Sequence, residues 1–195
     1  MVKFKILGGV VNVDKEITKL DEFTLEVIDI IKKHADYLII SGYVAIFFGR
    51  SRATEDVDIF IKDLSFEKFN EMYNEFIKNG YELTIDNAKG LYYDYLKERL
   101  PVNVWRKNFP LLRVEIKLAV KPTQLAAFND RIIAKFKDKE LVMSDIESQI
   151  AYKRYIARSD KDLADAKHLE LVFEGLSEYK IQRYRKIFEA EFNGY

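Results

Sequence analysis

The stretch from residue 37 to residue 61 constrains the fold more than any other part of this sequence. It begins with a short apolar run, Tyr37 to Ile40, which is typical of a buried strand. After Gly42, residues 43–48 are apolar on every side, as in a buried helix, and Gly49 favours its end. Residues 56–61 then alternate acidic or aromatic with aliphatic side chains, which indicates a second strand. The succession predicts a sheet covered by helices.

The flanking sequence continues this alternation of helices and strands. Apolar residues at helical spacing predict amphipathic helices over residues 21–35 and from an N-cap at Ser65 to the Asn79-Gly80 stop, with a shorter helix from Pro122. Strands are predicted over Val102–Trp105 and Leu112–Ala119, and a hairpin over Ile132–Val142.

The C-terminal part has a different pattern. Ser144 and Glu147 form a capping-box signature. Three helices without a strand signal are predicted after it, at 145–158, 160–174 and 177–192. The fold class is therefore α+β, with strands and helices alternating in the first part of the chain and a helical bundle at its C-terminal end. We expect an α/β domain over 1–143 and a bundle over 144–195 that packs tightly on it.

Composition excludes several classes of protein. The 195 residues include no cysteine and two histidines, which excludes disulfides, a thiol nucleophile and a histidine-rich metal site. The longest apolar stretch, Tyr37 to Gly49, is too short to span a bilayer, and the N-terminus lacks a signal-peptide pattern, so we expect a cytoplasmic protein. Basic and acidic residues balance at 32 each, so bulk attraction to nucleic acid is not indicated. Abundant lysine and glutamate without cysteine favour a thermophilic source.

Acidic residues on two predicted strands suggest a metal site. Asp56 and Asp58 are at positions i and i+2, so their carboxylates point to one side, about 7 Å apart. Carboxylate oxygens suit Mg²⁺, and two such ions can support phosphoryl transfer. Glu115 is the candidate third ligand, or a base for the acceptor. The alternatives are a solvated strand edge and pairing of Glu115 with Arg113 or Lys117 on the same strand face.

A phosphate site is predicted just upstream. Ser41-Gly42 lies between a strand end and a helix start, where a turn of small residues lets backbone N–H groups approach a phosphate. Arg50 and Arg52, on the following loop, could reach phosphate oxygens. The alternative for Gly42 is an ordinary tight turn.

Together these residues resemble the signature of the DNA polymerase beta-like nucleotidyltransferase superfamily, a small-residue turn, a helix, a glycine and then Arg-x-Thr-x-Asp-x-Asp. The matching positions are Ser41, Gly42, Gly49, Arg52, Thr54, Asp56 and Asp58. Ser41 stands where the pattern has glycine. The resemblance implies a mixed β-sheet flanked by helices, with Mg²⁺ on Asp56 and Asp58 and with Glu115 as the third acidic residue. It also implies NTP phosphates at Ser41-Gly42, with Arg52 and Thr54 on the adjoining loop.

A second resemblance lies in the C-terminal half. Lys153 followed by Lys161-Asp162-Leu163-Ala164-Asp165 is similar to the Lys and Arg-Asp-x-x-Asp pattern of abortive-infection toxin nucleotidyltransferases, with Lys161 in place of the usual arginine. It implies that Lys153 and Asp165 serve the active site. The alternatives are that Asp162 only caps a helix with Ser159, and that Asp165 pairs with Lys161 on a solvated surface.

The leading hypothesis is a Mg²⁺-dependent nucleotidyltransferase that moves an NMP from an NTP to an acceptor hydroxyl and releases pyrophosphate. The acceptor, a tRNA end, a protein side chain or a small molecule, would lie against the helical bundle and residues 97–167, which contain 16 basic and 10 acidic residues. A toxin–antitoxin role, with a cognate antitoxin or a homodimer as partner, is inferred from the second likeness. The alternatives are a non-catalytic nucleotide-binding or antitoxin-like protein on the same fold, and a structural interaction protein with solvated carboxylates.

Overall fold

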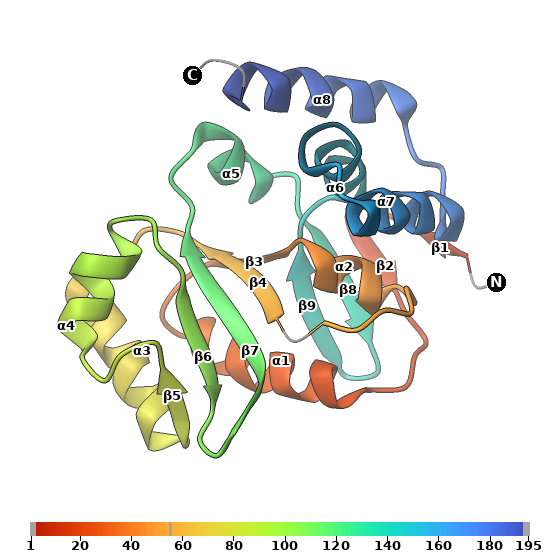
Figure 1. Cartoon of the computed structure of the whole chain (residues 1–195). Coiled ribbons are helices and arrows are strands. Elements are labelled where there is room, and N and C mark those ends of the chain that lie inside the picture. The colour runs from red at the N-terminus through yellow and green to blue at the C-terminus, as the bar shows by residue number, and fades with distance from the viewer. Residues whose placement is uncertain (1–2, 55, 193–195) are drawn as a thin grey trace. The chain divides into compact units, whose positions relative to one another are not determined.

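A computed structural model describes residues 3–54 and 56–192 (Figure 1). Within them the chain forms two compact units, each assembled from separate stretches of sequence. The first unit comprises residues 3–15, 40–52 and 122–192, and the second comprises residues 16–39 and 53–121. Residues 122–143 thus share a unit with the C-terminal helices, which differs from the expected division at 143/144. The boundary of a separately folding domain stays a prediction.

The strands of the second unit hold the predicted acidic residues. Their hydrogen-bonded order is β3-β4-β7-β6-β5, with bounds Tyr37–Ile40, Asp56–Ile61, Phe109–Leu118, Val102–Arg106 and Tyr81–Leu83 respectively. β4 and β7 pair in parallel, whereas β6 pairs antiparallel with both β7 and β5. The strands predicted for β3, β4, β6 and β7 are confirmed, and β5 was not predicted.

In the second unit, the helices α1 (Lys19–Ile31), α3 (Phe66–Lys78) and α4 (Ala88–Gly90) begin at side-chain caps, whereas the π-helical segment η1 (Leu91–Leu96) follows α4 without one. Ser65 caps α3 as predicted, since its side chain accepts a hydrogen bond from the Lys68 backbone N–H. α3 buries the apolar residues Phe69, Met72 and Phe76, which recur at helical spacing. α4 and η1 were not predicted, because tyrosines at 92, 93 and 95 give no clear helical period.

The strands of the first unit are short. They are β1 (Phe4–Lys5), β2 (Val10–Asn12), β8 (Ile132–Phe136), β9 (Lys139–Met143) and β10 (Phe173–Glu174). β8 and β9 form the predicted hairpin, and β2 pairs in parallel with β8. β10 pairs in parallel with β1, so the prediction that no strand follows residue 144 is wrong. Two residues are too few to show a strand period, so β10 could not be recognised from its residues alone.

The helices of the first unit include the predicted C-terminal ones. They are α2 (Gly42–Phe47), α5 (Pro122–Ala127), α6 (Ile146–Tyr152), the π-helical segment η2 (Lys153–Ala157), α7 (Asp160–Val172) and α8 (Glu178–Phe192). The predicted Ser144/Glu147 capping box is wrong. Asp145 caps α6 by accepting a hydrogen bond from the Ser148 backbone N–H at 3.0 Å. The Ser144 hydroxyl accepts instead from the Gln149 side chain. None of the described helices is long and apolar enough to cross a membrane.

An aromatic core fixes α2. Phe47 and Phe48, at the end of α2, are almost completely buried. Phe48 lies 4.7 Å from Phe173 and 5.1 Å from Phe4 between ring centroids, and Phe47 lies 5.1 Å from Phe136. Edge-to-face pairs of this kind contribute about 0.5–1.5 kcal/mol each beyond their buried area. The packing therefore holds α2, and the Ser41-Gly42 turn that begins it, in a fixed position within the first unit.

Candidate functional site

Three predicted carboxylates share one half-exposed face of the second unit. Along β4, Asp56 and Asp58 are partly exposed while the intervening Val57 is fully buried, as period-two alternation requires. The parallel register places Asp58 directly opposite Glu115 of β7. Opposed residues on neighbouring strands point to the same side of a sheet. β4 and β7 thus present Asp56, Asp58 and Glu115 together, as the strand pattern predicted.

Two basic residues of β7 pair with these carboxylates and offset part of their negative charge. Arg113 Nε lies 2.9 Å from Asp56 Oδ1, and Lys117 Nζ lies 2.5 Å from Asp58 Oδ1 and 2.8 Å from Glu115 Oε2. Burial by itself would lower the pKa of Lys117, but the charges and hydrogen bonds of Asp58 and Glu115 outweigh it and raise that pKa above its usual value. The alternative that Glu115 pairs with a basic neighbour therefore holds, with Lys117 as the neighbour. We call these five residues the acidic face.

The acidic face offers suitable ligands for Mg²⁺, although they are not gathered around a metal position. In the part of the chain that the structure describes, no three Asp, Glu or His side chains are grouped closely enough to hold a metal ion. The available donors are carboxylate oxygens, the type Mg²⁺ prefers. The Lys117 ammonium already contacts both Asp58 and Glu115, so these two carboxylates accept a shared positive charge. The residues fit a divalent cation in chemistry, and metal binding by Asp56, Asp58 and Glu115 stays a prediction.

A polar residue that the sequence analysis missed lies beside Glu115. Asn103 of β6 is directly opposite Glu115 in the antiparallel register with β7. Its side chain is partly exposed, whereas Val102 and Val104 on either side of it are fully buried. Its backbone N–H donates to the Thr84 hydroxyl at 2.8 Å. The Val-Asn-Val alternation was a signal for a polar residue on this face.

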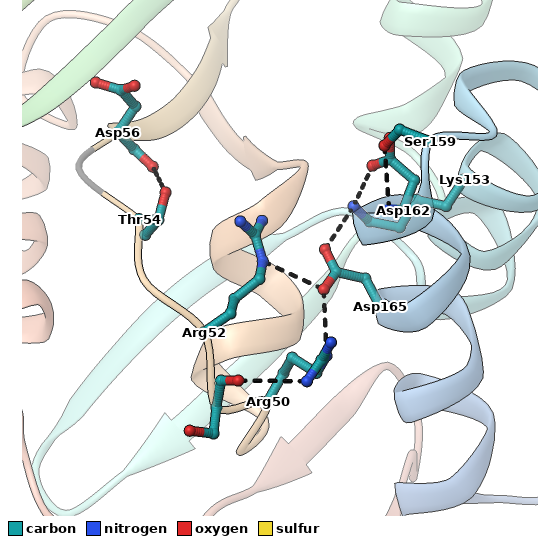
Figure 2. Close-up of polar contacts among 9 residues, drawn as sticks. Arg50, Arg52, Thr54, Asp56, Lys153, Ser159, Asp162 and Asp165 are labelled. Atoms are coloured by element: carbon teal, nitrogen blue, oxygen red, sulfur yellow. Dashed lines mark hydrogen bonds and ion pairs between the residues drawn. The ribbon is translucent and has the colours of Figure 1, made fainter.

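Thr54 binds the backbone at the start of β4. Its hydroxyl donates a hydrogen bond to the main-chain oxygen of Asp56 at 3.1 Å (Figure 2). Glu55 lies outside the described residues. This contact orients the chain where it enters β4, and the nucleotide-binding role that the resemblance implies for Thr54 stays a prediction.

In the first unit, the predicted phosphate turn lies against Arg52. Ser41 has a φ of 64°, an uncommon conformation for a residue with a side chain. A Cβ atom added to Gly42 would lie 1.9 Å from Arg52 Nη2 and 3.1 Å from Arg52 Cζ. Only glycine therefore lets the guanidinium approach the turn so closely. The structure brings together Gly42 and Arg52, as the motif predicted.

Arg52 also belongs to a group of charged residues around Asp165 of α7. Asp165 is completely buried, and its Oδ1 faces Arg52 Nε at 3.2 Å and Arg50 Nε at 3.6 Å. Its Oδ2 accepts a hydrogen bond from Lys153 Nζ at 3.1 Å (Figure 2). Lys153 is 1% exposed. The alternative that Asp165 pairs with Lys161 on a solvated surface is therefore wrong, because helix packing turns Asp165 inward.

Asp162 joins this group from the start of α7. The Ser159 hydroxyl caps α7 by accepting from the Asp162 backbone N–H, and the Asp162 carboxylate accepts from Lys153 Nζ at 3.2 Å. Burial would raise the pKa of Asp162, but the Ser159 hydrogen bond and the Lys153 charge outweigh it and lower that pKa. Asp162 thus takes part in the predicted helix start and also pairs with Lys153. We call the set of Arg50, Arg52, Lys153, Asp162 and Asp165 the buried charge cluster.

The predicted site residues thus fall into two groups. The first unit contains Ser41, Gly42, Arg52, Lys153 and Asp165, and the second contains Thr54, Asp56, Asp58 and Glu115. Within the first unit, Arg52 lies next to both Gly42 and Asp165. Within the second, Asp56, Asp58 and Glu115 share one strand face.

Solved structures of other proteins have a similar fold. No protein-family model matches the sequence, and no curated protein matches it. A crystal structure of the lincosamide antibiotic adenylyltransferase LnuA with lincomycin bound is similar with a TM-score of 0.53 at 14% identity, over 81% of this chain and 99% of that one. An antigenic nucleotidyltransferase-like protein from Paracoccidioides brasiliensis is similar with a TM-score of 0.51 at 12% identity, over 90% of this chain and 88% of that one. The chain therefore has a nucleotidyltransferase-like fold with a mixed arrangement of strands and helices.

Proposed function

We propose that this protein is a nucleotidyltransferase that transfers an NMP from an NTP to an acceptor hydroxyl. The main support is the acidic face, where Asp56, Asp58 and Glu115 project from one side of two adjacent parallel strands. A nucleotidyltransferase-like fold agrees with this chemistry, although a fold alone does not imply an activity. The presence of NTPs in the cytoplasm makes that compartment the proposed location.

The acidic face would hold Mg²⁺ through Asp56, Asp58 and Glu115. When bound, the ion would supply positive charge that stabilises the oxygens of the transferring phosphoryl group. The chain's own contribution is to keep the three carboxylates on one rigid strand pair, with Val57 and Val114 anchoring the opposite face in the core. The Lys117 ammonium offsets part of the negative charge of Asp58 and Glu115.

Ser41, Gly42, Arg52 and Thr54 would bind the nucleotide. The Arg52 guanidinium lies against the Gly42 backbone. The N–H groups of this guanidinium could donate hydrogen bonds to the β- and γ-phosphate oxygens. In the reaction, the acceptor oxygen bonds to the α-phosphorus while the bond from that phosphorus to the pyrophosphate oxygen breaks. The hydroxyl proton passes to Glu115 or to solvent, and pyrophosphate leaves.

The acceptor class stays open among a tRNA end, a protein side chain and a small molecule. LnuA, whose structure was solved with lincomycin bound, is named an adenylyltransferase for lincosamide antibiotics. A small hydroxylated molecule is therefore one acceptor to test. RNA and protein are the other acceptors to test, and transfer to either would support a toxin–antitoxin role.

One observation favours a second candidate, a non-catalytic nucleotide-binding or antitoxin-like protein. The carboxylates of Asp56, Asp58 and Glu115 are all engaged by Arg113 or Lys117. Persistent ion pairs of this kind would compete with a metal ion for the same oxygens. Tight NTP binding without transfer to any acceptor would identify this second function.

The test is incubation with each NTP labelled at the α-phosphate, Mg²⁺, and total RNA, total protein or a library of hydroxylated small molecules. We expect label transfer by the natural chain and a loss of roughly thousandfold in Asp56→Asn, since about 4 kcal/mol of charge stabilisation disappears. Asp63→Asn is the matched control, because Asp63 is exposed and pairs with Lys97 away from the acidic face. Transfer that persists in Asp56→Asn would contradict the proposal.

A further inference from the structure

Two charged residues of the buried charge cluster are almost completely buried. Asp165 is 0% exposed and Lys153 is 1% exposed, so neither side chain is open to solvent. Burying a carboxylate and an ammonium has a large desolvation penalty, which only close pairing offsets. A residue this deeply buried cannot contact a substrate without rearrangement. Any effect of Lys153 and Asp165 on a ligand therefore passes through the side chains that they contact.

Arg52 links the buried charge cluster to the predicted phosphate turn. Its Nε lies 3.2 Å from Asp165 Oδ1, while its Nη2 would meet a Cβ at Gly42 at 1.9 Å. Figure 2 shows the two terminal nitrogens of Arg52 pointing away from Asp165. The guanidinium is therefore held at its inner nitrogen and presents its outer nitrogens at the turn. A guanidinium is a planar donor of the kind that binds oxyanions, and here it lies at the predicted phosphate turn.

Lys153 and the start of α7 fix Asp165 in turn. Lys153 Nζ donates to Asp165 Oδ2 at 3.1 Å and to Asp162 Oδ1 at 3.2 Å, so one ammonium ties together two carboxylates on the same helix. Lys153 opens the π-helical segment η2, and such segments recur at functional sites. Asp165 Oδ2 is thus hydrogen-bonded, whereas its buried Oδ1 makes no hydrogen bond and faces the arginines by charge alone.

We propose that Asp165 is a positioning residue that orients Arg52 toward the Ser41-Gly42 turn, with Lys153 holding Asp165 in place. The C-terminal helices would thereby set the affinity for the polyphosphate of the nucleotide without touching it. This inference rests on the proposed function, because it takes a polyphosphate as the ligand of Arg52. Arg50 Nε lies farther from Asp165 Oδ1, at 3.6 Å, so Arg52 rather than Arg50 is the residue that Asp165 orients.

The first experiment measures binding of tripolyphosphate, without metal or acceptor, to the full chain by calorimetry. We expect Asp165→Asn to weaken binding roughly tenfold, since a misoriented charged donor loses about one charge-assisted hydrogen bond. Arg52→Gln should weaken it at least as much, and the double variant no more than Arg52→Gln alone. Additive losses, or unchanged affinity in a folded Asp165→Asn, would overturn the proposal.

A second readout does not depend on the ligand. We expect the Arg52 Nε–H proton to exchange slowly with solvent in the natural chain, because Asp165 shields it, and to exchange several times faster in Asp165→Asn. Equal exchange rates would overturn the positioning role. Slow exchange in a chain that binds no tripolyphosphate would instead contradict the proposed nucleotide site and leave Asp165 a structural residue only.

Asp165→Asn removes one of the two carboxylates that pair with the buried Lys153, and a second variant guards against a loss of folding. Asp165→Asn combined with Lys153→Met removes one negative and one positive charge together and is expected to fold. The combined variant should show the same loss of tripolyphosphate affinity. An affinity equal to that of the natural chain would overturn the proposal.

Discussion

The acidic face and the buried charge cluster contain the same types of charged group in very different surroundings. In the acidic face, the side chains of Lys117 and Asp58 are 32% and 21% exposed. In the buried charge cluster, those of Lys153 and Asp165 are 2% and 0% exposed. Partly hydrated ion pairs contribute little net stability and can exchange one cation for another, whereas buried pairs tolerate no loss of a partner. We infer that the acidic face is suited to binding a cation, whereas the buried charge cluster is suited to keeping its own side chains in place.

The largest expected effect is on stability. Lys153→Met leaves Asp165 and Asp162 without their ammonium, and we expect the free energy of unfolding to fall by about 3–5 kcal/mol. Lys117→Met, the matched change in the acidic face, should alter it by no more than about 1 kcal/mol. Denaturant titration of both variants measures the difference. Equal losses would remove the contrast between the two regions.

A smaller effect is expected from Gly42→Ala. The new Cβ would displace the flexible end of Arg52 rather than backbone, so folding should be little affected, while tripolyphosphate affinity falls roughly tenfold. Gly90→Ala is the control, because its Cβ would meet the flexible end of Ile85 at 2.9 Å in the second unit. Calorimetric titration with tripolyphosphate measures the affinity of both variants. Unchanged affinity in Gly42→Ala would show that the turn does not bind phosphate.

A few-fold effect is expected for cation binding by the acidic face. Lys117→Met removes the ammonium from Asp58 and Glu115, so we expect Mn²⁺, a spectroscopic substitute for Mg²⁺, to bind several times more tightly. Lys97→Met, which removes a half-exposed partner of Asp63, should not change the affinity. Electron paramagnetic resonance of free Mn²⁺ measures both. A weaker affinity in Lys117→Met would mean that Lys117 organises these carboxylates instead of competing for them.

The smallest effect concerns pH. Because the pKa of Asp162 is lowered in the folded chain, its ionised form stabilises the fold above its ordinary pKa of 3.8, and this contribution is lost as the pH falls through the lower folded value. Asp162→Asn should therefore be less stable than the natural chain by about 1 kcal/mol near neutral pH. The difference should shrink below pH 3.8. Thermal unfolding across this range would test it, and a difference independent of pH would assign the effect to packing.

Local pattern predicted the acidic face well. The alternation in Asp56–Ile61 and in the strand that holds Glu115 fixed which side chains share a face, because successive residues of a strand point to opposite sides. It also left Lys117 and Arg113 open as partners of Glu115. In the folded chain the parallel register sets Arg113 opposite Asp56, with which it pairs, and Glu115 pairs with Lys117. Register depends on how two distant strands align, which no single stretch of sequence specifies.

Local pattern failed where the deciding contact was distant in sequence. Asp165 and Lys161 are close along α7, which favoured a surface pair, yet Asp165 is buried against Lys153 and Arg52. The cap of α6 at Asp145 rather than Ser144 is a shift of one residue, which depends on backbone angles that two adjacent cap-forming residues do not distinguish.

Local periodicity and side-chain type were enough to predict the order of the longer helices and strands, the face on which Asp56, Asp58 and Glu115 lie, and the chemistry available there. The burial of Lys153 and Asp165, and the place of Arg52 between Asp165 and Gly42, are seen only in the folded chain. Burial and the pairing of distant charges arise from packing between elements, and packing is a property of the folded chain rather than of any one segment.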